Sequence, residues 1–267
     1  MWNRKWETLA VRIADMTWMD YADRLRAGRP VVIVPAGALE QHGPHLPLAT
    51  DTIIPSMLAE MVAERIGALV APAFVYGCRS QPKSGGGNHF VGTTSLWGST
   101  YATMLADLVE EFGRHGVKKL VLLDGHSENQ PFLVEAVERA LVNLRRDGVT
   151  DMRVIRLGYW TTISNDLEAV LFPDGLLSWD LEHAAVMETS VMLHLRPDLV
   201  HMDLIPDDPP ADFPPYETFP VDTRPIPAHG VLSSAASASA DKGRAVVDGL
   251  VPDLARHITA AFADMEP

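Results

Sequence analysis

Two short patterns in the sequence combine a carboxylate with an imidazole, Glu40-x-His42 and His126-x-Glu128, and a third acid, Asp51, follows the first pattern in the same predicted loop. Carboxylate oxygens and imidazole nitrogens are ligands that suit zinc, manganese and similar divalent ions. A carboxylate between two cations can bridge them, and Asp51 is the natural bridge. Two ions ~3.5–4 Å apart can share a hydroxide, lower its pKa and polarise a substrate carbonyl. These residue types therefore predict metal-assisted hydrolysis.

Either pattern alone could be incidental, because short motifs produce many false positives. The elements before them favour a shared site. An apolar run at 31–34 has the composition of a buried strand, and a second such strand is expected at 118–124. In parallel α/β sheets, ligands bind beyond the carboxyl ends of the strands. We therefore expect both patterns to meet at one edge of a sheet.

Strand and helix patterns alternate along the chain, which predicts an α/β fold with a mostly parallel central sheet and helices on both faces. The expected strands are 31–34, 68–71, 118–124 and 153–157, and the expected helices are 53–67, 100–115, 130–146, 184–195 and 233–262. A short first helix is expected after the capping residue Thr17, with Trp18 on its apolar face. Leu108 is expected on the inward face of its helix.

The 267 residues carry a formal net charge of −13, which argues against a nucleic-acid binder and against docking on anionic membranes. The single cysteine, Cys78, excludes an intrachain disulfide and a cysteine-rich zinc site. The N-terminal residues lack the apolar stretch of a signal peptide, and no run approaches the ~20 apolar residues of a membrane span. We expect one domain over 1–267, soluble and cytoplasmic.

Residues 206–227 contain eight prolines together with aromatic and acidic side chains. Proline excludes a regular helix or a central strand there. The tract is too apolar for a simple linker, so we expect an ordered arm that packs on the body of the protein or on a neighbouring subunit. The glycine-rich loop 77–94 is long, and such loops in compact domains are usually functional or disordered.

Glu188 lies among apolar residues of a predicted helix, five positions after His183. A buried acid is costly unless it is paired, so we expect Glu188 to meet a cation, a metal-bound water or His183; a structural ion pair is the alternative. Trp160 and Trp179 lie in a segment expected to be irregular. They belong either to the core or to a lid that stacks on a flat or cationic ligand.

Four other residues have a structural interpretation beside a functional one. His45 either supports a metal ligand or packs in the core. His89 either binds substrate or ties down its loop. Nothing marks Cys78 as a nucleophile. Ser127 lacks the Gly-x-Ser-x-Gly context of a serine hydrolase.

The sequence resembles the creatininase (creatinine amidohydrolase) family of binuclear metal hydrolases in three signatures: GALEQHGPHLPLATD, GHSEN and HAAVMETSVML. The resemblance continues through KSGGGNHFVGTTSL, the segments around Trp160 and Trp179, and the tract DDPPADFPPYETFPVD, so it covers nearly the whole chain. It implies a three-layer α/β/α sandwich that binds two divalent ions per chain, zinc or manganese, and assembles as a homohexamer.

The resemblance also implies a role for each site residue. Glu40, Asp51 and His126 hold one metal, and His42, Asp51 and Glu128 hold the other. Ser84 contacts the substrate, Trp160 and Trp179 enclose it, and Asp180, His183 and Glu188 are polar catalytic residues. The implied reaction opens a small cyclic amide, creatinine to creatine, by a metal-bridging hydroxide.

Ser127 departs from the family pattern, because creatinine-acting members usually have a tyrosine beside the substrate at this position. This departure favours an alternative, a family relative that hydrolyses a different lactam, a formamide or a short peptide. A second alternative is a non-catalytic protein with structural metals. Structural zinc sites are usually closed four-ligand cages, whereas the glycine loop and the tryptophans indicate a ligand cavity.

Overall fold

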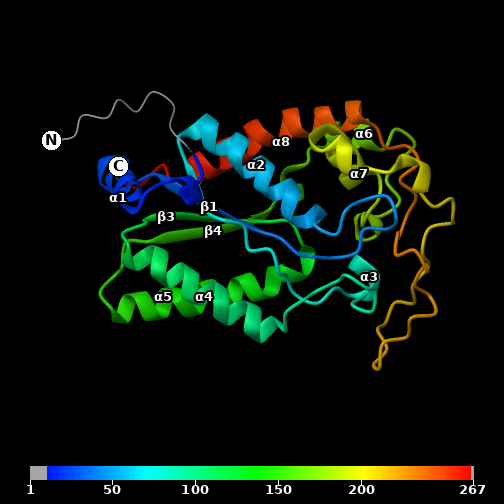
Figure 1. Ribbon diagram of the computed structural model, residues 1–267, viewed down its shortest axis with the longest axis horizontal. Coiled ribbons are helices and arrows are strands. Elements are labelled where there is room, and N and C mark those ends of the chain that lie inside the picture. Colours follow the sequence, from blue (N-terminus) through cyan, green and yellow to red (C-terminus); the bar gives the residue numbers. More distant parts are fainter. Residues whose placement is uncertain (1–10, 266–267) are drawn as a thin grey trace.

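The computed structural model describes residues 11–265, and its central feature is a parallel sheet between two layers of helices (Figure 1). In the described residues the sheet has four strands in the order β2-β1-β3-β4, and every pairing is parallel. The strands are β1 (Val31–Ala36), β2 (Leu69–Val70), β3 (Lys119–Asp124) and β4 (Arg153–Gly158). The predicted α/β class with its three layers is confirmed.

The helices cover both faces of this sheet. Those with α geometry are α1 (Trp18–Gly28), α2 (Thr50–Ile66), α3 (Pro82–Gly85), α4 (Gly98–Arg114), α5 (Gln130–Arg146), α6 (Asn165–Leu171), α7 (Val186–Leu195) and α8 (Ala240–Ala261). Short 3-10 helices are η1 (Ile13–Asp15), η2 (Ser127–Asn129), η3 (Tyr159–Thr162), η4 (Trp179–Leu181), η5 (Pro197–Leu199) and η6 (Met202–Leu204). Figure 1 shows α4 and α5 on one face of the sheet and α2 and α8 on the other.

Successive side chains of the strands enter two different cores, because strand residues alternate between faces. Ile33 and Val121 pack in the core beside α2, α7 and α8. Val32 and Leu120 pack in the core beside α4 and α5. Both faces are buried, which explains why β1 and β3 are continuous apolar runs in the sequence.

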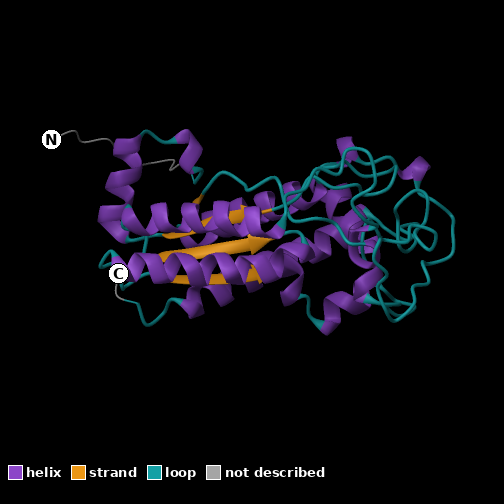
Figure 2. Cartoon of the chain, turned by 90° about the horizontal axis from the view of Figure 1, so that it is seen from below, coloured by secondary structure: helices purple, strands orange, loops and turns teal. Residues whose placement is uncertain are grey.

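The carboxyl ends of three strands coincide at one edge of the sheet. Ala36 of β1 pairs with Asp124 of β3, and Asp124 pairs with Gly158 of β4. The N–H of Gly125 donates to the Ala36 carbonyl at 2.8 Å, which joins the loops after β1 and β3. Figure 2 shows the loops of the molecule gathered beyond this end of the strands. Any group carried by these loops is therefore brought to one place.

Some expectations about the helices were wrong. Trp18 is 78% exposed rather than on a buried face, since Leu25 is the buried residue of α1. Leu108 of α4 is also exposed, because the buried stripe of that helix is narrower than expected. The last helix begins at Ala240 rather than at residue 233, because the Ser239 side chain caps it by accepting the Lys242 N–H. The segment expected to be irregular contains the short helix α6.

The proline-rich tract, residues 206–227, has neither helix nor strand. Its chain is nevertheless tied to the body: Lys83 Nζ donates to the Pro214 carbonyl at 2.5 Å, and the Ala211 N–H donates to the Leu232 carbonyl at 2.8 Å. Residues 1–10, on which part of the signal-peptide argument rests, lie outside the described residues. Among residues 11–265, no helix combines the length and hydropathy needed to cross a bilayer.

Candidate active site

The loops after β1 and β3 meet the first turn of α2. Glu40 and His42 follow β1, His126 follows β3, and Asp51 is the second residue of α2 rather than a loop residue. A helix N-terminus favours a negative charge, which suits a carboxylate at this position. A Cβ added at Gly125 would lie 2.2 Å from the Asp51 carbonyl oxygen, so only glycine lets the β3 loop approach α2 this closely.

Three groups of buried side chains in residues 11–265 have the composition and spacing of metal ligands. They are Glu40, Asp51 and His126; His42, Asp51 and Glu188; and Glu40, His42 and His183. Glu40, His42 and Asp51 each belong to two of these groups, so the groups overlap in space. We call Glu40, His42, Asp51 and His126 the floor of the site; each is at most 3% exposed.

The floor is held at contact distances. His126 Nδ1 lies 3.0 Å from Glu40 Oε2 and 3.1 Å from Asp51 Oδ2. His42 Nε2 lies 3.0 Å from Asp51 Oδ1 and 3.7 Å from Glu188 Oε2. The two imidazoles therefore contact opposite oxygens of one carboxylate.

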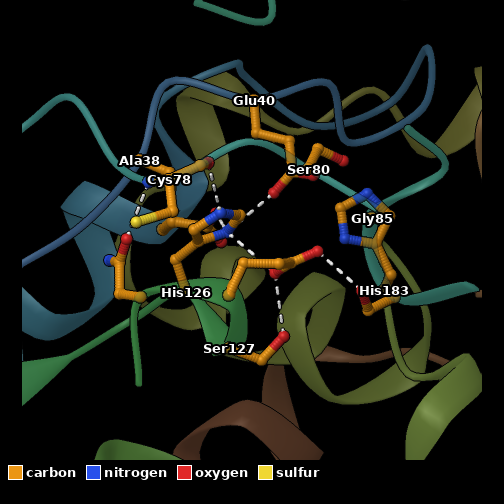
Figure 3. Close-up of polar contacts among 12 residues, drawn as sticks. Ala38, Glu40, Cys78, Ser80, Gly85, His126, Ser127 and His183 are labelled. Carbon is orange, nitrogen blue, oxygen red and sulfur yellow. Dashed lines mark hydrogen bonds and ion pairs between the residues drawn. The ribbon is translucent and has the colours of Figure 1, made fainter. Parts of the chain in front are cut away.

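Each floor histidine uses its other nitrogen to bond a backbone carbonyl. His126 Nε2–H donates to the Cys78 carbonyl at 3.0 Å, and His42 Nδ1–H donates to the Glu40 carbonyl at 3.1 Å. Figure 3 shows His126 between Cys78 on one side and Glu40 on the other. In the neutral tautomer the remaining lone pair of each ring points at carboxylates, which is the arrangement of metal-bound histidine.

Unpaired polar atoms in the floor show that its residues fit a cation. Glu40 Oε1 is buried without a hydrogen bond or an ion-pair contact among the described residues, and His42 Nε2 and Asp51 Oδ2 have no hydrogen bond beyond their ion-pair contacts within the site. Buried polar groups are otherwise nearly always paired, since leaving one unpaired costs about 1–3 kcal/mol. Oxygen and nitrogen donors directed at one another are satisfied by a divalent ion between them. The floor residues therefore fit a metal-binding role.

Burial and neighbouring charges shift the pKa values of the two floor carboxylates, Glu40 and Asp51, in opposite directions. Burial raises the pKa of Glu40. Burial also opposes the charge of Asp51, but His42 and His126 outweigh it and hold the pKa of Asp51 well below its usual range. For both histidines burial lowers the pKa, and the surrounding carboxylates outweigh burial and raise it well above the usual value. The surrounding carboxylates therefore favour the charged form of both imidazoles.

Glu128 lies beside the floor, held by three donors. Its Oε1 accepts Ser84 Oγ–H at 2.6 Å and the Gln81 N–H at 3.0 Å, and its Oε2 accepts Ser127 Oγ–H at 2.9 Å. Oε2 is also 3.5 Å from His126 Nδ1. The structure thus brings Glu128 towards His126, whereas the carboxylate placed with His42 and Asp51 is Glu188. The resemblance-based assignment of Glu128 to the second metal stays a prediction.

A cavity of about 210 Å³ opens above the floor. Eleven of the residues singled out from the sequence line it: Glu40, Asp51, Ser84, His126, Ser127, Glu128, Trp160, Trp179, Asp180, His183 and Glu188. His42 lies beneath them, fully buried. Side chains from six separate segments of the sequence are therefore brought to one cavity.

The rim of the cavity, which we define as Ser127, Trp160, Trp179 and Asp180, is more exposed than the floor. Trp160 belongs to η3 after β4 and packs edge-to-face on Tyr159, with ring centroids 5.2 Å apart. Trp179 belongs to η4 and is 39% exposed. The rim thus offers two large aromatic surfaces around the opening.

Two polar groups of this region were not singled out from the sequence. Gln41, between Glu40 and His42, contacts His183 at 2.9 Å. Glu182 lines the cavity, accepts the Met187 N–H at 3.0 Å, and has its pKa raised to about 7 by burial. Glu182 could have been found from the sequence, because it is an acidic residue shortly before a predicted helix and such a residue can accept the first N–H groups of that helix.

Three residues with open interpretations belong to none of the ligand groups. His45 is buried 3.0 Å from Thr189 Oγ1, and burial lowers its pKa to about 4, which supports the packing interpretation. Burial raises the pKa of Cys78 to about 12, so its thiol is not a nucleophile at neutral pH. His89 is exposed and packs on Phe90, with ring centroids 4.3 Å apart.

Comparisons with known proteins match most of the chain to one family. The creatininase family model, described as "Creatinine amidohydrolase", matches residues 14–258. Creatinine amidohydrolase of Pseudomonas putida is 47% identical over 254 residues, 95% of this chain and 98% of that protein. A mycofactocin precursor peptide peptidase of Mycolicibacterium smegmatis is 38% identical over 183 residues, 65% of this chain and 61% of that protein.

The fold matches solved creatininases. The crystal structure of creatinine amidohydrolase (creatininase) has a TM-score of 0.94 at 47% identity, over 96% of this chain and 99% of that chain. A creatininase of Zn-Zn type and a Mn creatininase each match with a TM-score of 0.93 at 47% identity, over 95% of this chain and 98% or 99% of theirs. The sequence match spans most of the chain, and the chain therefore belongs to the creatininase family of amidohydrolases.

Proposed function

We propose that this protein is a binuclear metal-dependent amidohydrolase that opens a small cyclic amide, creatinine to creatine. The observation that carries the proposal is the floor, where two ligand groups share Asp51 beneath a cavity walled by Trp160 and Trp179. The 47% identity to a creatinine amidohydrolase supports the same substrate.

The proposed metals are zinc or manganese, matching the solved creatininases. Glu40, Asp51 and His126 would hold one ion, and His42 and Asp51 would hold the other with Glu188 or Glu128. When bound, such ions supply an activated hydroxide at neutral pH and polarise the carbonyl that it attacks.

The rim would bind the substrate. A flat, guanidinium-like ring fits between aromatic faces, which attract cations through the ring quadrupole. The cavity, about 210 Å³, is smaller than the ~300–1,000 Å³ of sites for drug-sized ligands, and this suits a small ring. Asp180 at the opening adds a negative charge that favours the same ligand.

His183 and Glu188 would move the proton that hydrolysis requires. Water adds to the ring carbonyl, the C–N bond breaks, and the departing ring nitrogen takes a proton. Both residues line the cavity, and the Ala184 N–H holds Glu188 Oε2 at 2.7 Å. Ala184 adopts a left-handed backbone conformation with φ of 55°, which directs this N–H at the carboxylate. Strained residues of this kind often lie at functional sites.

The direct test is creatine release from creatinine by purified protein loaded with zinc or manganese. We expect turnover that disappears on chelation and returns with metal. Creatinine is excluded as substrate if turnover does not exceed that of the metal-stripped control.

A second candidate function is hydrolysis of another small amide, and Ser127 is the observation that favours it. A serine occupies less of the opening than the expected tyrosine, and a relative 38% identical acts as a precursor peptide peptidase. A panel of lactams, formamides and short peptides separates the two candidates, because the true substrate should be preferred by orders of magnitude. Metal content below about one ion per chain, with folding unaffected by chelator, would favour a non-catalytic protein instead.

A further inference from the structure

Gln41 lies between two residues of the floor, yet its side chain has a separate set of partners. The residue is buried, with 5% exposed. Its Oε1 accepts the Gly43 N–H at 2.9 Å, and its Nε2 lies 2.9 Å from the carbonyl oxygens of both Gly85 and Gly230. One carboxamide therefore joins the loop after β1, the helix α3 and the segment that follows the proline-rich tract.

These partners determine which end of the carboxamide is oxygen. The Gly43 N–H requires an acceptor, so the atom beside it is the oxygen, and the nitrogen faces two carbonyls. A primary amide has two N–H donors, and the carbonyls of Gly85 and Gly230 take both. The amide has no donor left for another partner.

His183 is that additional neighbour. Its Nε2 lies 2.9 Å from Gln41 Nε2 and 2.9 Å from the Gln41 carbonyl oxygen. Because the amide has no hydrogen left to give, His183 must donate its own Nε2–H to that carbonyl. The neutral imidazole then keeps its lone pair on Nδ1.

The geometry points to Gln41 as a positioning residue, whose saturated carboxamide selects the Nε2–H tautomer of His183 and holds this ring beside His42. The ring centroids of His183 and His42 are 4.4 Å apart. The inference rests on the proposed function for the use of the Nδ1 lone pair in proton transfer. The tautomer itself is a property of the folded chain and requires no substrate.

The fit around the carboxamide is close. Gly230 has a φ of +80°, and a Cβ added there would lie 2.0 Å from Gln41 Oε1. The Gly230 N–H donates to the Pro227 carbonyl at 2.8 Å, at the end of the proline-rich tract. The turn that ends the proline-rich tract therefore packs against the carboxamide of Gln41.

Nitrogen NMR of the zinc-loaded protein with labelled histidine tests the tautomer. The His183 signals are assigned by their absence in His183→Gln. We expect the wild type to show a proton on Nε2 and an unprotonated Nδ1. Gln41→Met keeps the length of the side chain but removes its amide donors and acceptor, and we expect a mixture of tautomers. A proton on Nδ1 in the wild type would overturn the inference, whether or not the protein turns over creatinine.

Kinetics provide the second readout. Since small displacements of a reacting group can cost ~100-fold in rate, we expect Gln41→Met to lower kcat by about tenfold to hundredfold. Zinc content should not change, and KM should stay within about threefold. The control is Thr93→Val, which removes only the bond from the Gln41 backbone N–H to Thr93 Oγ1 at 3.0 Å. Equal kcat in the two variants would contradict the inference, and if Gln41→Met does not fold, the wild-type spectrum still decides.

Discussion

The floor and the rim of the cavity are built differently. Every floor side chain is at most 3% exposed, and both floor imidazoles are oriented by backbone carbonyls. The rim is carried by short 3-10 helices and partly exposed, with Trp179 at 39%. A buried, oriented floor holds reactive groups without reorganisation, whereas an exposed rim can change with little cost to the fold. We therefore propose that the floor carries the chemistry and that the rim determines the choice of substrate.

The largest effect is expected on metal affinity, when an aspartate is changed to asparagine in the floor and, for comparison, in the rim. Asp51→Asn removes a charge shared by two ligand groups, and Asp180→Asn removes a charge from the rim. Mutation of a residue that only supports a metal ligand typically lowers metal affinity ~10–100-fold. Because Asp51 is a proposed ligand itself, we expect Asp51→Asn to lower metal affinity by more than about 100-fold. Asp180→Asn should keep its metals. Elemental analysis and metal titration measure the metal content and affinity of both variants. Equal metal retention in the two would contradict the distinction between floor and rim.

Metal removal should change how the stability of the floor depends on pH. The pKa values of His42 and His126 are raised well above the usual value. A raised pKa contributes stability that is fully present below the unfolded value, ~6.5, and is lost as pH rises through the folded value. The metal-free protein should therefore lose stability as pH rises above ~6.5. Zinc requires unprotonated imidazoles, so its stabilisation should grow over the same range.

Thermal unfolding with and without zinc measures this effect. Zinc at ~100 times its Kd should add about 2.7 kcal/mol to the free energy of unfolding. For a chain of this size that corresponds to a rise in Tm of roughly 5–10 °C. Parallel pH profiles for the metal-free and zinc-bound protein would show that the floor histidines do not bind the ion.

An intermediate effect is expected at the rim from Trp179→Ala. Loss of a cation–π partner worth up to about 2 kcal/mol should raise KM by roughly tenfold to thirtyfold, with metal content unchanged. Trp179→Phe keeps an aromatic face but loses the bond from Trp179 Nε1–H to Glu168 Oε2. Its KM should therefore lie between those of the wild type and Trp179→Ala. Steady-state kinetics with creatinine give the values. A large fall in kcat at constant KM would place Trp179 with the chemistry instead.

Two serines hold Glu128, and the smallest effect is expected from the exposed one, Ser127. Ser84→Ala removes the shorter bond at 2.6 Å, and Ser127→Ala removes the exposed one at 2.9 Å. Hydrogen bonds to charged groups contribute about 1.5–3 kcal/mol, and solvent exposure places Ser127 at the lower end. We expect kcat/KM to fall about tenfold for Ser127→Ala and further for Ser84→Ala. The reverse order would indicate that Ser127 contacts the substrate directly.

Most of the sheet could be predicted from the sequence, because strands buried on both faces appear as continuous apolar runs. The position of the floor followed from this, because its residues lie in the segments that follow the ends of those strands. Helix boundaries were less accurate. Asp51 was expected in a loop but begins α2, and α8 begins at Ala240, since capping residues rather than hydrophobic periodicity set these ends. Trp18 was expected to be buried and is exposed, because one apolar side chain does not show whether another element covers it.

By itself, the sequence determined the types of ligand and the strands that deliver them, because both are encoded in short local stretches. It did not determine which carboxylate faces which imidazole. Glu188 stands beside His42 although the two are far apart in the chain, and His183 is held by Gln41 in the same way. Those distances depend on how α2 and α7 pack against the sheet edge, and only the tertiary structure fixes that packing.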